Sequence, residues 1–168
     1  KNLSLSLLID IKWGGQLFSG TNAYAYIYGL HKNTLKGRAE CDAAGYPVTG
    51  CMVGEGVNQN GQPNTVKVLP QAYYGRIGEQ IAEEFVYEAN FIKLRELRLG
   101  YRLPDRWLTR SPLRSMTIAL VGRNLAYLYN SVPNVDPESS YNNGNAQGLE
   151  LAGVPQTRSL GLSLNVRF

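Results

Sequence analysis

The last twelve residues of the chain, TRSLGLSLNVRF, carry the pattern that most limits what this sequence can fold into. Every second residue there is apolar, and the row consists of Leu160, Leu162, Leu164, Val166 and Phe168. A strand with a period of two has one apolar face and one polar face. The segment 158–168 is therefore predicted to be a β-strand, and its apolar face must meet either a protein core or lipid.

Three more segments alternate in the same way, at about 3–13, 91–103 and 115–128. The first has apolar residues at every odd position, with the apolar Leu8 as the single exception to the alternation, and its length suits a tilted transmembrane strand of about 9–11 residues. In the second, the apolar phase changes between Leu94 and Leu97, which predicts a β-bulge near Arg95 and Glu96. The sequence therefore predicts an all-β fold with about four long antiparallel strands.

The connections between these segments alternate between long and short. Residues 14–90 and 130–157 form long connections, whereas 104–113 is short. Bacterial outer-membrane barrels have long extracellular loops and short periplasmic turns, so this order agrees with a transmembrane barrel. Within the first long loop, Ile77, Ile81 and Phe85 recur every four residues and predict a short amphipathic helix.

The composition excludes some classes of protein. The net charge is +4, but the basic residues are scattered instead of gathered on one face, so no nucleic-acid partner is expected. No stretch of about 18 apolar residues occurs, which excludes a transmembrane helix. Transmembrane strands remain compatible with this composition, because polar residues of the lumen dilute their signal.

Two cysteines, Cys41 and Cys51, lie in the stretch CDAAGYPVTGC. The histidine and the further cysteines that would complete a zinc site are missing from their neighbourhood. A disulfide that pins a surface loop in an oxidising compartment is the favoured interpretation, and two free thiols are the alternative.

Neither catalysis nor metal binding has good support in the sequence. The single histidine, His31, has no nearby Ser, Cys or Asp in a recognisable catalytic motif, so we expect no enzyme and no cofactor. In NVDPESSYNNGN, the residues Asn134, Asp136 and Glu138 are spaced like the first ligands of a calcium loop. The later positions of that motif do not match, so a turn rich in Asn and Asp is favoured and no metal site is expected.

Several motifs occur together and in a specific order: FIKLRELRLGYRLP, VGRNLAYLY, NVDPE and a final strand that ends in Phe168. With them, the chain resembles the C-terminal part of SusC/RagA-type TonB-dependent transporters of the Bacteroidetes outer membrane. The opening LIDIKWGGQLFSGT fits the same family, whereas the loop 39–75 matches no motif.

This resemblance implies a multi-pass barrel of about 22 strands in the outer membrane, filled by a plug. It also implies TonB and a SusD-like lipoprotein as partners, and the import of a glycan or a peptide. Residues 1–168 would be the C-terminal segment of that barrel without the plug, hence a piece of a longer polypeptide. The row from Leu160 to Phe168 would then face outer-membrane lipid and act as the signal for barrel assembly.

Loop tyrosines are candidates for substrate binding, because their rings could stack on sugars. They are Tyr24, Tyr26, Tyr28, Tyr73 and Tyr74. The favoured alternative is that these amphipathic rings pack within their own loop or against the lid. The rival function is a secreted β-sandwich that binds carbohydrate, but a sandwich should have about seven short strands, with turns every 8–12 residues.

Overall fold

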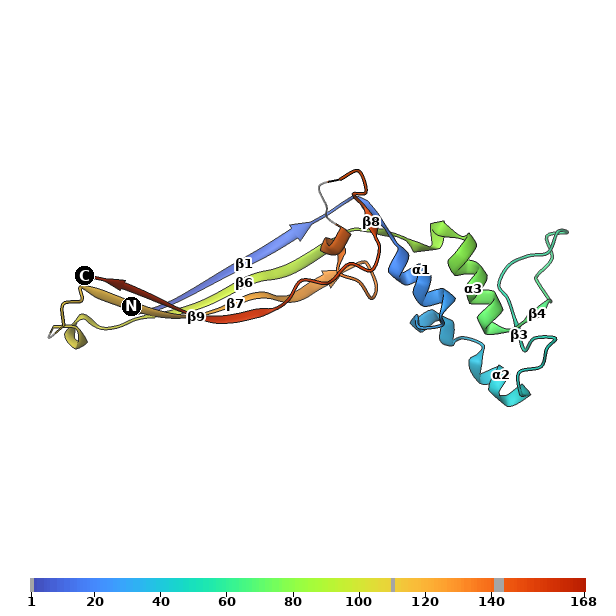
Figure 1. Ribbon diagram of the computed structural model, residues 1–168, viewed down its shortest axis with the longest axis horizontal. Coiled ribbons are helices and arrows are strands. Elements are labelled where there is room, and N and C mark those ends of the chain that lie inside the picture. Colours follow the sequence, from blue (N-terminus) through green and yellow to red (C-terminus); the bar gives the residue numbers. More distant parts are fainter. Residues whose placement is uncertain (1, 110, 141–143) are drawn as a thin grey trace.

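The computed structural model describes residues 2–109, 111–140 and 144–168. Its main sheet consists of β1 (Leu3–Lys12), β6 (Phe91–Arg102), β7 (Ser115–Asn130) and β9 (Ser159–Arg167). Neighbouring strands pair antiparallel in the order β1-β6-β7-β9, so β1 and β9 are the edges of an open sheet (Figure 1). The bounds of these strands differ by at most about two residues from those that the alternation predicts.

A β-bulge interrupts the main sheet. The register of β6 against both of its neighbours shifts between Leu94 and Glu96. Against β1 the extra residue is Arg95, whereas against β7 the extra residue lies on β7, where Asn124 and Leu125 face Arg95. Leu94 and Leu97 are three positions apart in the sequence, yet the bulge brings both onto the same face. The bulge predicted from the phase change is confirmed.

The connection between β1 and β6 folds into a helical module, residues 16–88. Its helices are α1 (Gly20–Ile27), α2 (Arg38–Ala44) and α3 (Pro70–Gln80), with short 3-10 segments η1 (Lys32–Leu35) and η2 (Ala82–Phe85). Its strands are β2 (Gln16–Ser19), β3 (Met52–Val53), β4 (Lys67–Val68) and β5 (Val86–Glu88). The fold is therefore mixed, and the prediction of an all-β class is too narrow.

Local signals explain where these helices begin and end. The Ser19 hydroxyl accepts a hydrogen bond from the Asn22 N–H at 3.1 Å and caps α1. Pro70 starts α3, where its missing N–H costs nothing. The helix expected around Ile77 and Phe85 thus lies further upstream, and η2 forms its last turn as a separate segment. None of the helices in the described part of the chain is long and apolar enough to cross a membrane.

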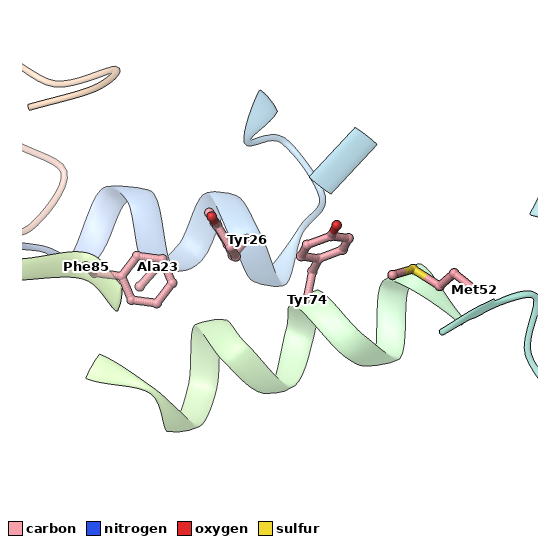
Figure 2. Packing of buried hydrophobic residues seen from close by; sticks show 5 residues of the cluster. All are labelled: Ala23, Tyr26, Met52, Tyr74 and Phe85. Atoms are coloured by element: carbon pink, nitrogen blue, oxygen red, sulfur yellow. The ribbon is translucent and has the colours of Figure 1, made fainter. Parts of the chain in front are cut away.

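The helical module has a hydrophobic core of its own, which Figure 2 shows. Five buried residues form it: Ala23, Tyr26, Met52, Tyr74 and Phe85. The Tyr26 ring meets Phe85 and Tyr74 edge to face, with centroids 5.0 and 5.9 Å apart. The core therefore joins α1, β3, α3 and η2, which are distant in sequence.

A second long connection, residues 131–158, runs from β7 back to β9, and we call it the strap. It contains η4 (Pro137–Ser140) and β8 (Leu149–Glu150). β8 pairs parallel with β2, and β5 pairs antiparallel with β2 on its other side. The strap therefore ties the main sheet to the helical module.

The opposite end of the main sheet carries only a short turn. This turn joins β6 to β7 and contains η3 (Asp105–Trp107). Both chain ends lie at this end of the molecule, far from the helical module (Figure 1). The two ends of the sheet are thus built very differently.

Candidate functional site

One face of the main sheet is apolar across all four strands. The pairing puts two rows in register: Leu5, Leu99, Leu120 and Leu162, followed by Leu7, Leu97, Gly122 and Leu160. Leu5 is 63% exposed and Leu162 is 81% exposed. A monomeric protein in water rarely leaves so large an apolar surface bare. This face is therefore a candidate interface.

The height of this face suits the membrane interior. From Leu3 to Trp13, the residue directly after β1, the chain extends over ten residue steps, which is about 33 Å at roughly 3.3 Å per residue. A tilt of about 40° reduces this to about 25 Å, the height of the apolar band in outer-membrane barrels. At one end Trp13 stacks on Tyr129 with centroids 6.0 Å apart, and exposed Phe168 lies at the other. Aromatic residues at both edges are typical of a membrane-spanning wall.

The opposite face of the sheet is polar and bears many small residues. One row in register consists of Ser4, Gly100, Ala119 and Ser163. Glu96 and Arg123 form an ion pair across neighbouring strands at 2.9 Å. Small and polar side chains suit a wall that borders water or another polar segment. The two faces of the same sheet are therefore made for different surroundings.

A charged cluster of four residues, Asp10, Lys93, Arg95 and Glu138, fixes the strap on this polar face. The Lys93 ammonium donates to Glu138 at 2.5 Å, and the Arg95 guanidinium donates to Glu138 at 2.6 Å and also to Asp10. The Lys93 and Glu138 side chains are 3% and 7% exposed. Burial alone would raise the pKa of Glu138, but the hydrogen bonds from Arg95 and Lys93 outweigh it and lower the pKa.

The residues with calcium-like spacing are engaged within the protein. Asp136 accepts hydrogen bonds from the Tyr127 hydroxyl at 2.5 Å and from the Glu138 N–H at 2.9 Å, which forms an Asx turn. Asn134 donates to the side chain of Asn22 at 3.1 Å. Within residues 2–109, 111–140 and 144–168, no group of three His, Cys, Asp or Glu side chains could hold a metal. The geometry agrees with the turn that the sequence favours.

A second buried carboxylate fixes the strap at the start of α1. Glu150 is 1% exposed and accepts hydrogen bonds from the Ser19 hydroxyl at 2.7 Å and the Thr21 hydroxyl at 2.6 Å. The Gly153 N–H donates to it at 3.0 Å. Burial by itself would raise the pKa of Glu150, but these hydrogen bonds have the larger combined effect and lower it. The strap thus has two anchors, one on the sheet and one on the module.

The five candidate tyrosines divide into two groups. Tyr26 and Tyr74 lie in the core of the module, and Tyr73 packs against that core. Tyr24 and Tyr28 are 59% and 71% exposed on α1, and their rings stack with centroids 6.5 Å apart. Because a sugar can stack only on an accessible ring, Tyr24 and Tyr28 are the candidates that suit ligand binding.

Cys41 and Cys51 are joined by a disulfide with Cα atoms 5.0 Å apart. It links α2 to the residue before β3. Cys41 is fully buried, so the bridge lies inside the module. The short loop between the two cysteines is thereby held beside β4, where the Cys51 N–H donates to the Val68 carbonyl oxygen at 3.2 Å.

Sequence reasoning did not identify the anchors of the strap. The sequence presents Glu138 only as a possible metal ligand, and it offers no pattern that distinguishes Glu150. A signal for the first anchor exists, because Asp10 and Lys93 fall at the same level of the polar face. The partner acid, however, lies 45 residues away from Lys93 on a connection without periodicity.

Comparison with solved structures first defines the class. The chain aligns with part of the barrel chain in the RagAB peptide importer. In its 'closed-closed' state, the match covers 98% of this chain and 15% of that chain, with a TM-score of 0.61 and 16% identity. In the 'open-open' state the match covers 100% of this chain and 16% of the importer chain, with a TM-score of 0.62 and 17% identity. At this identity the match shows the fold alone, that of a piece of an outer-membrane barrel.

Curated relatives then indicate the family. The chain is 30% identical over 96 residues to TonB-dependent receptor P3 of Formosa agariphila, which covers 54% of this chain and 10% of the relative. It is 32% identical over 89 residues to TonB-dependent receptor P26 of the same organism. This match covers 50% of this chain and 9% of the relative. No family model matches the chain.

Part of the chain is therefore homologous to TonB-dependent receptors, and the resemblance found in its motifs is confirmed to that extent. The chain spans about a tenth of the length of these curated relatives. TonB-dependent receptors are outer-membrane transporters and not enzymes.

Proposed function

We propose that this chain forms the C-terminal wall of a SusC/RagA-type TonB-dependent transporter that imports a glycan or a peptide across the outer membrane. The strands β1, β6, β7 and β9 lie in lipid, and the helical module and the strap lie outside the cell. A plug and further strands complete the barrel, a SusD-like lipoprotein covers it, and TonB supplies energy through the plug.

The observation that carries this proposal is the bare apolar face that crosses four strands and has a polar face behind it. A β-sandwich, the rival fold, would cover that face with a second sheet. In the described residues the face stays exposed from Leu3, at 66%, to Leu162, at 81%. The smaller sheets lie beyond one end of the main sheet (Figure 1). Lipid is the environment in which such a face is stable.

The edge strands support the same proposal. Among the residues that the structure describes, β9 pairs only with β7 and β1 pairs only with β6. An open edge in lipid leaves backbone groups unpaired at a cost of several kcal/mol each, so both edges need further strands. The row from Leu160 to Phe168 on β9 is the proposed assembly signal, and closure of the barrel removes both edges.

The position of labels on two neighbouring residues tests the proposal. In the full-length polypeptide, inserted into lipid vesicles, Leu162→Cys and Ser163→Cys each receive the same fluorophore. The side chains of these two residues point to opposite faces of β9. A quencher attached to lipid tails should strongly quench the label at position 162 and weakly quench the label at 163.

The matched pair makes the result unambiguous. Equal quenching at both positions, or a polypeptide that stays soluble and resists insertion, would overturn the proposal. In that case the apolar rows would have to form the inner face of a sandwich.

A further inference from the structure

The end of the main sheet opposite the helical module carries a cluster of exposed arginines, which we call the arginine rim. Its members are Arg106 in η3 and Arg114 before β7, while Arg102 at the end of β6 and Arg167 at the end of β9 lie nearby on the polar face, where alternation places them. The only acidic residue of the 103–114 turn is Asp105, whose carboxylate is 3.4 Å from the Arg102 guanidinium. Among the described residues, no ion pair involves the other three arginines.

Lys93 and Arg95, nearer the other end of the sheet, are neutralised within the protein. Both bind Glu138, and Arg95 also binds Asp10. Arg106 and Arg114, by contrast, have no internal carboxylate partner among the described residues, and they stand directly beside the apolar face. This asymmetry points to an anion outside the described residues as the partner of the rim.

The rim borders the apolar face and its aromatic edge. Trp107 is 61% exposed and Phe168 is 77% exposed at this end, and Tyr101 is 40% exposed. Such residues prefer the boundary between hydrocarbon and head groups. Backbone pairing continues one step beyond β7, since the Arg114 N–H donates to the Arg167 carbonyl oxygen at 2.8 Å. Alternation from Met116 therefore places Arg114 on the apolar side of the sheet.

We infer that the arginine rim binds the phosphate groups of anionic phospholipids in the periplasmic leaflet. The inference rests on the proposed function, because it requires the apolar face to lie in the membrane. A guanidinium can bind two phosphate oxygens at once through parallel hydrogen bonds. The adjoining apolar face supplies the contact for the acyl chains of the same lipid. A soluble anion would use the arginines alone, so the combination favours a lipid.

Lipid selectivity of the full-length polypeptide tests this inference. Spin-labelled phosphatidylglycerol and spin-labelled phosphatidylethanolamine are compared in reconstituted vesicles, and the ratio of their association constants is measured. The double variant Arg106→Glu/Arg114→Glu should lower this ratio by more than tenfold, because each arginine near an anionic surface contributes roughly fivefold. Arg106→Lys/Arg114→Lys keeps the charge and should retain most of the preference.

A matched control changes the same net charge in the helical module. Lys67 in β4 and Arg76 in α3 are both exposed there. The double variant Lys67→Glu/Arg76→Glu should leave the lipid preference unchanged. An equal loss in both double variants would show a general charge effect and would overturn the inference. Displacement of phosphatidylglycerol by an equal concentration of inorganic phosphate would also overturn it, since the rim would then bind free anions.

Membrane insertion and lipid selectivity separate the proposed function from the inference about the arginine rim. Faster gel migration before heating shows that wild type and variants insert. If they insert and the ratio of lipid association constants does not change, only the inference about the arginine rim is wrong. If the wild-type polypeptide does not insert at all, the proposed function falls and the inference falls with it.

Discussion

The main sheet and the helical module follow opposite rules of burial. Leu162 in the sheet is 81% exposed, whereas Phe85 in the module is fully buried. Both residues are apolar, so the difference reflects their surroundings. The module buries its apolar residues as a protein in water does, and the sheet presents them outward as a protein in lipid does. Exposure by region, and not overall composition, therefore indicates which solvent each part meets.

The largest expected loss of stability comes from a substitution in the core of the helical module. Phe85→Ala removes a fully buried ring that contacts Tyr26 and should cost about 3–5 kcal/mol of module stability. Hydrogen exchange of α1 and α3 in the full-length polypeptide measures it, and both helices should lose protection.

The neighbouring residue provides the control for this variant. Val86 is 41% exposed, so Val86→Ala should have a much smaller effect. If Phe85→Ala left the protection of α1 unchanged, the core drawn in Figure 2 would not hold the module together.

Next in size is the loss of the anchor between strap and sheet. Glu138→Gln leaves the Lys93 ammonium and the Arg95 guanidinium without their shared counter-charge, and breaking such a buried pair costs about 3–5 kcal/mol at most. The partial exposure of the Arg95 side chain, 23%, reduces this value. We expect faster hydrogen exchange in residues 131–140 while β1, β6 and β7 keep their protection.

An exposed glutamate serves as the reference for the anchor. Glu83 in η2 is exposed, and Glu83→Gln should change nothing in the strap. Equal exchange rates for wild type and Glu138→Gln would mean that contacts other than the charged cluster hold the strap.

A charge on the apolar face tests the other half of the comparison. Leu160 is 77% exposed and lies in register with Gly122, Leu97 and Leu7, at a level about midway along β1. Leu160→Arg should cost about 2–4 kcal/mol in a bilayer, whereas Ser159→Arg on the polar face should cost little. Urea titration of folding into vesicles measures both values. The same cost at both positions would contradict a lipid-facing row.

Acid should weaken the strap gradually. The pKa values of Glu138 and Glu150 are lowered in the folded state, so their contribution to stability is present above the unfolded value of about 4.3 and is lost as the pH falls below it. Exchange of residues 131–140 should therefore accelerate in this acidic range. Glu138→Gln should flatten that pH dependence, and an unchanged profile would exclude Glu138 as its source.

The strands could be predicted from sequence because period two is a local property. The phase change between Leu94 and Leu97 even revealed the bulge. The spacing of Cys41 and Cys51 favoured the disulfide, although the residues alone left free thiols open. Each of these signals lies within about a dozen residues of sequence.

Contacts between distant segments could not be predicted in this way. The Tyr26 ring meets Phe85 across almost sixty residues, and Glu150 binds Ser19 across 131. The helical module lies in a long connection for which the sequence pattern predicts only one short helix, so the prediction of an all-β fold missed it. Tyr26 and Tyr74 are buried because they belong to the core of that module. The sequence does not show this core, so it cannot separate these two tyrosines from the exposed ones.

The smallest effect on stability is expected at the exposed tyrosines. Tyr24 and Tyr28 are 59% and 71% exposed and touch one another along α1, so Tyr24→Ala/Tyr28→Ala should change module stability by no more than about 0.5 kcal/mol. If this pair contacts cargo or the SusD-like lid, the same variant should reduce uptake or co-purification of the lid. A variant that keeps its fold, its uptake and its lid would remove both residues as binding candidates. If the variant lost its fold, the prediction would be wrong, because the two tyrosines would then stabilise the module despite their exposure.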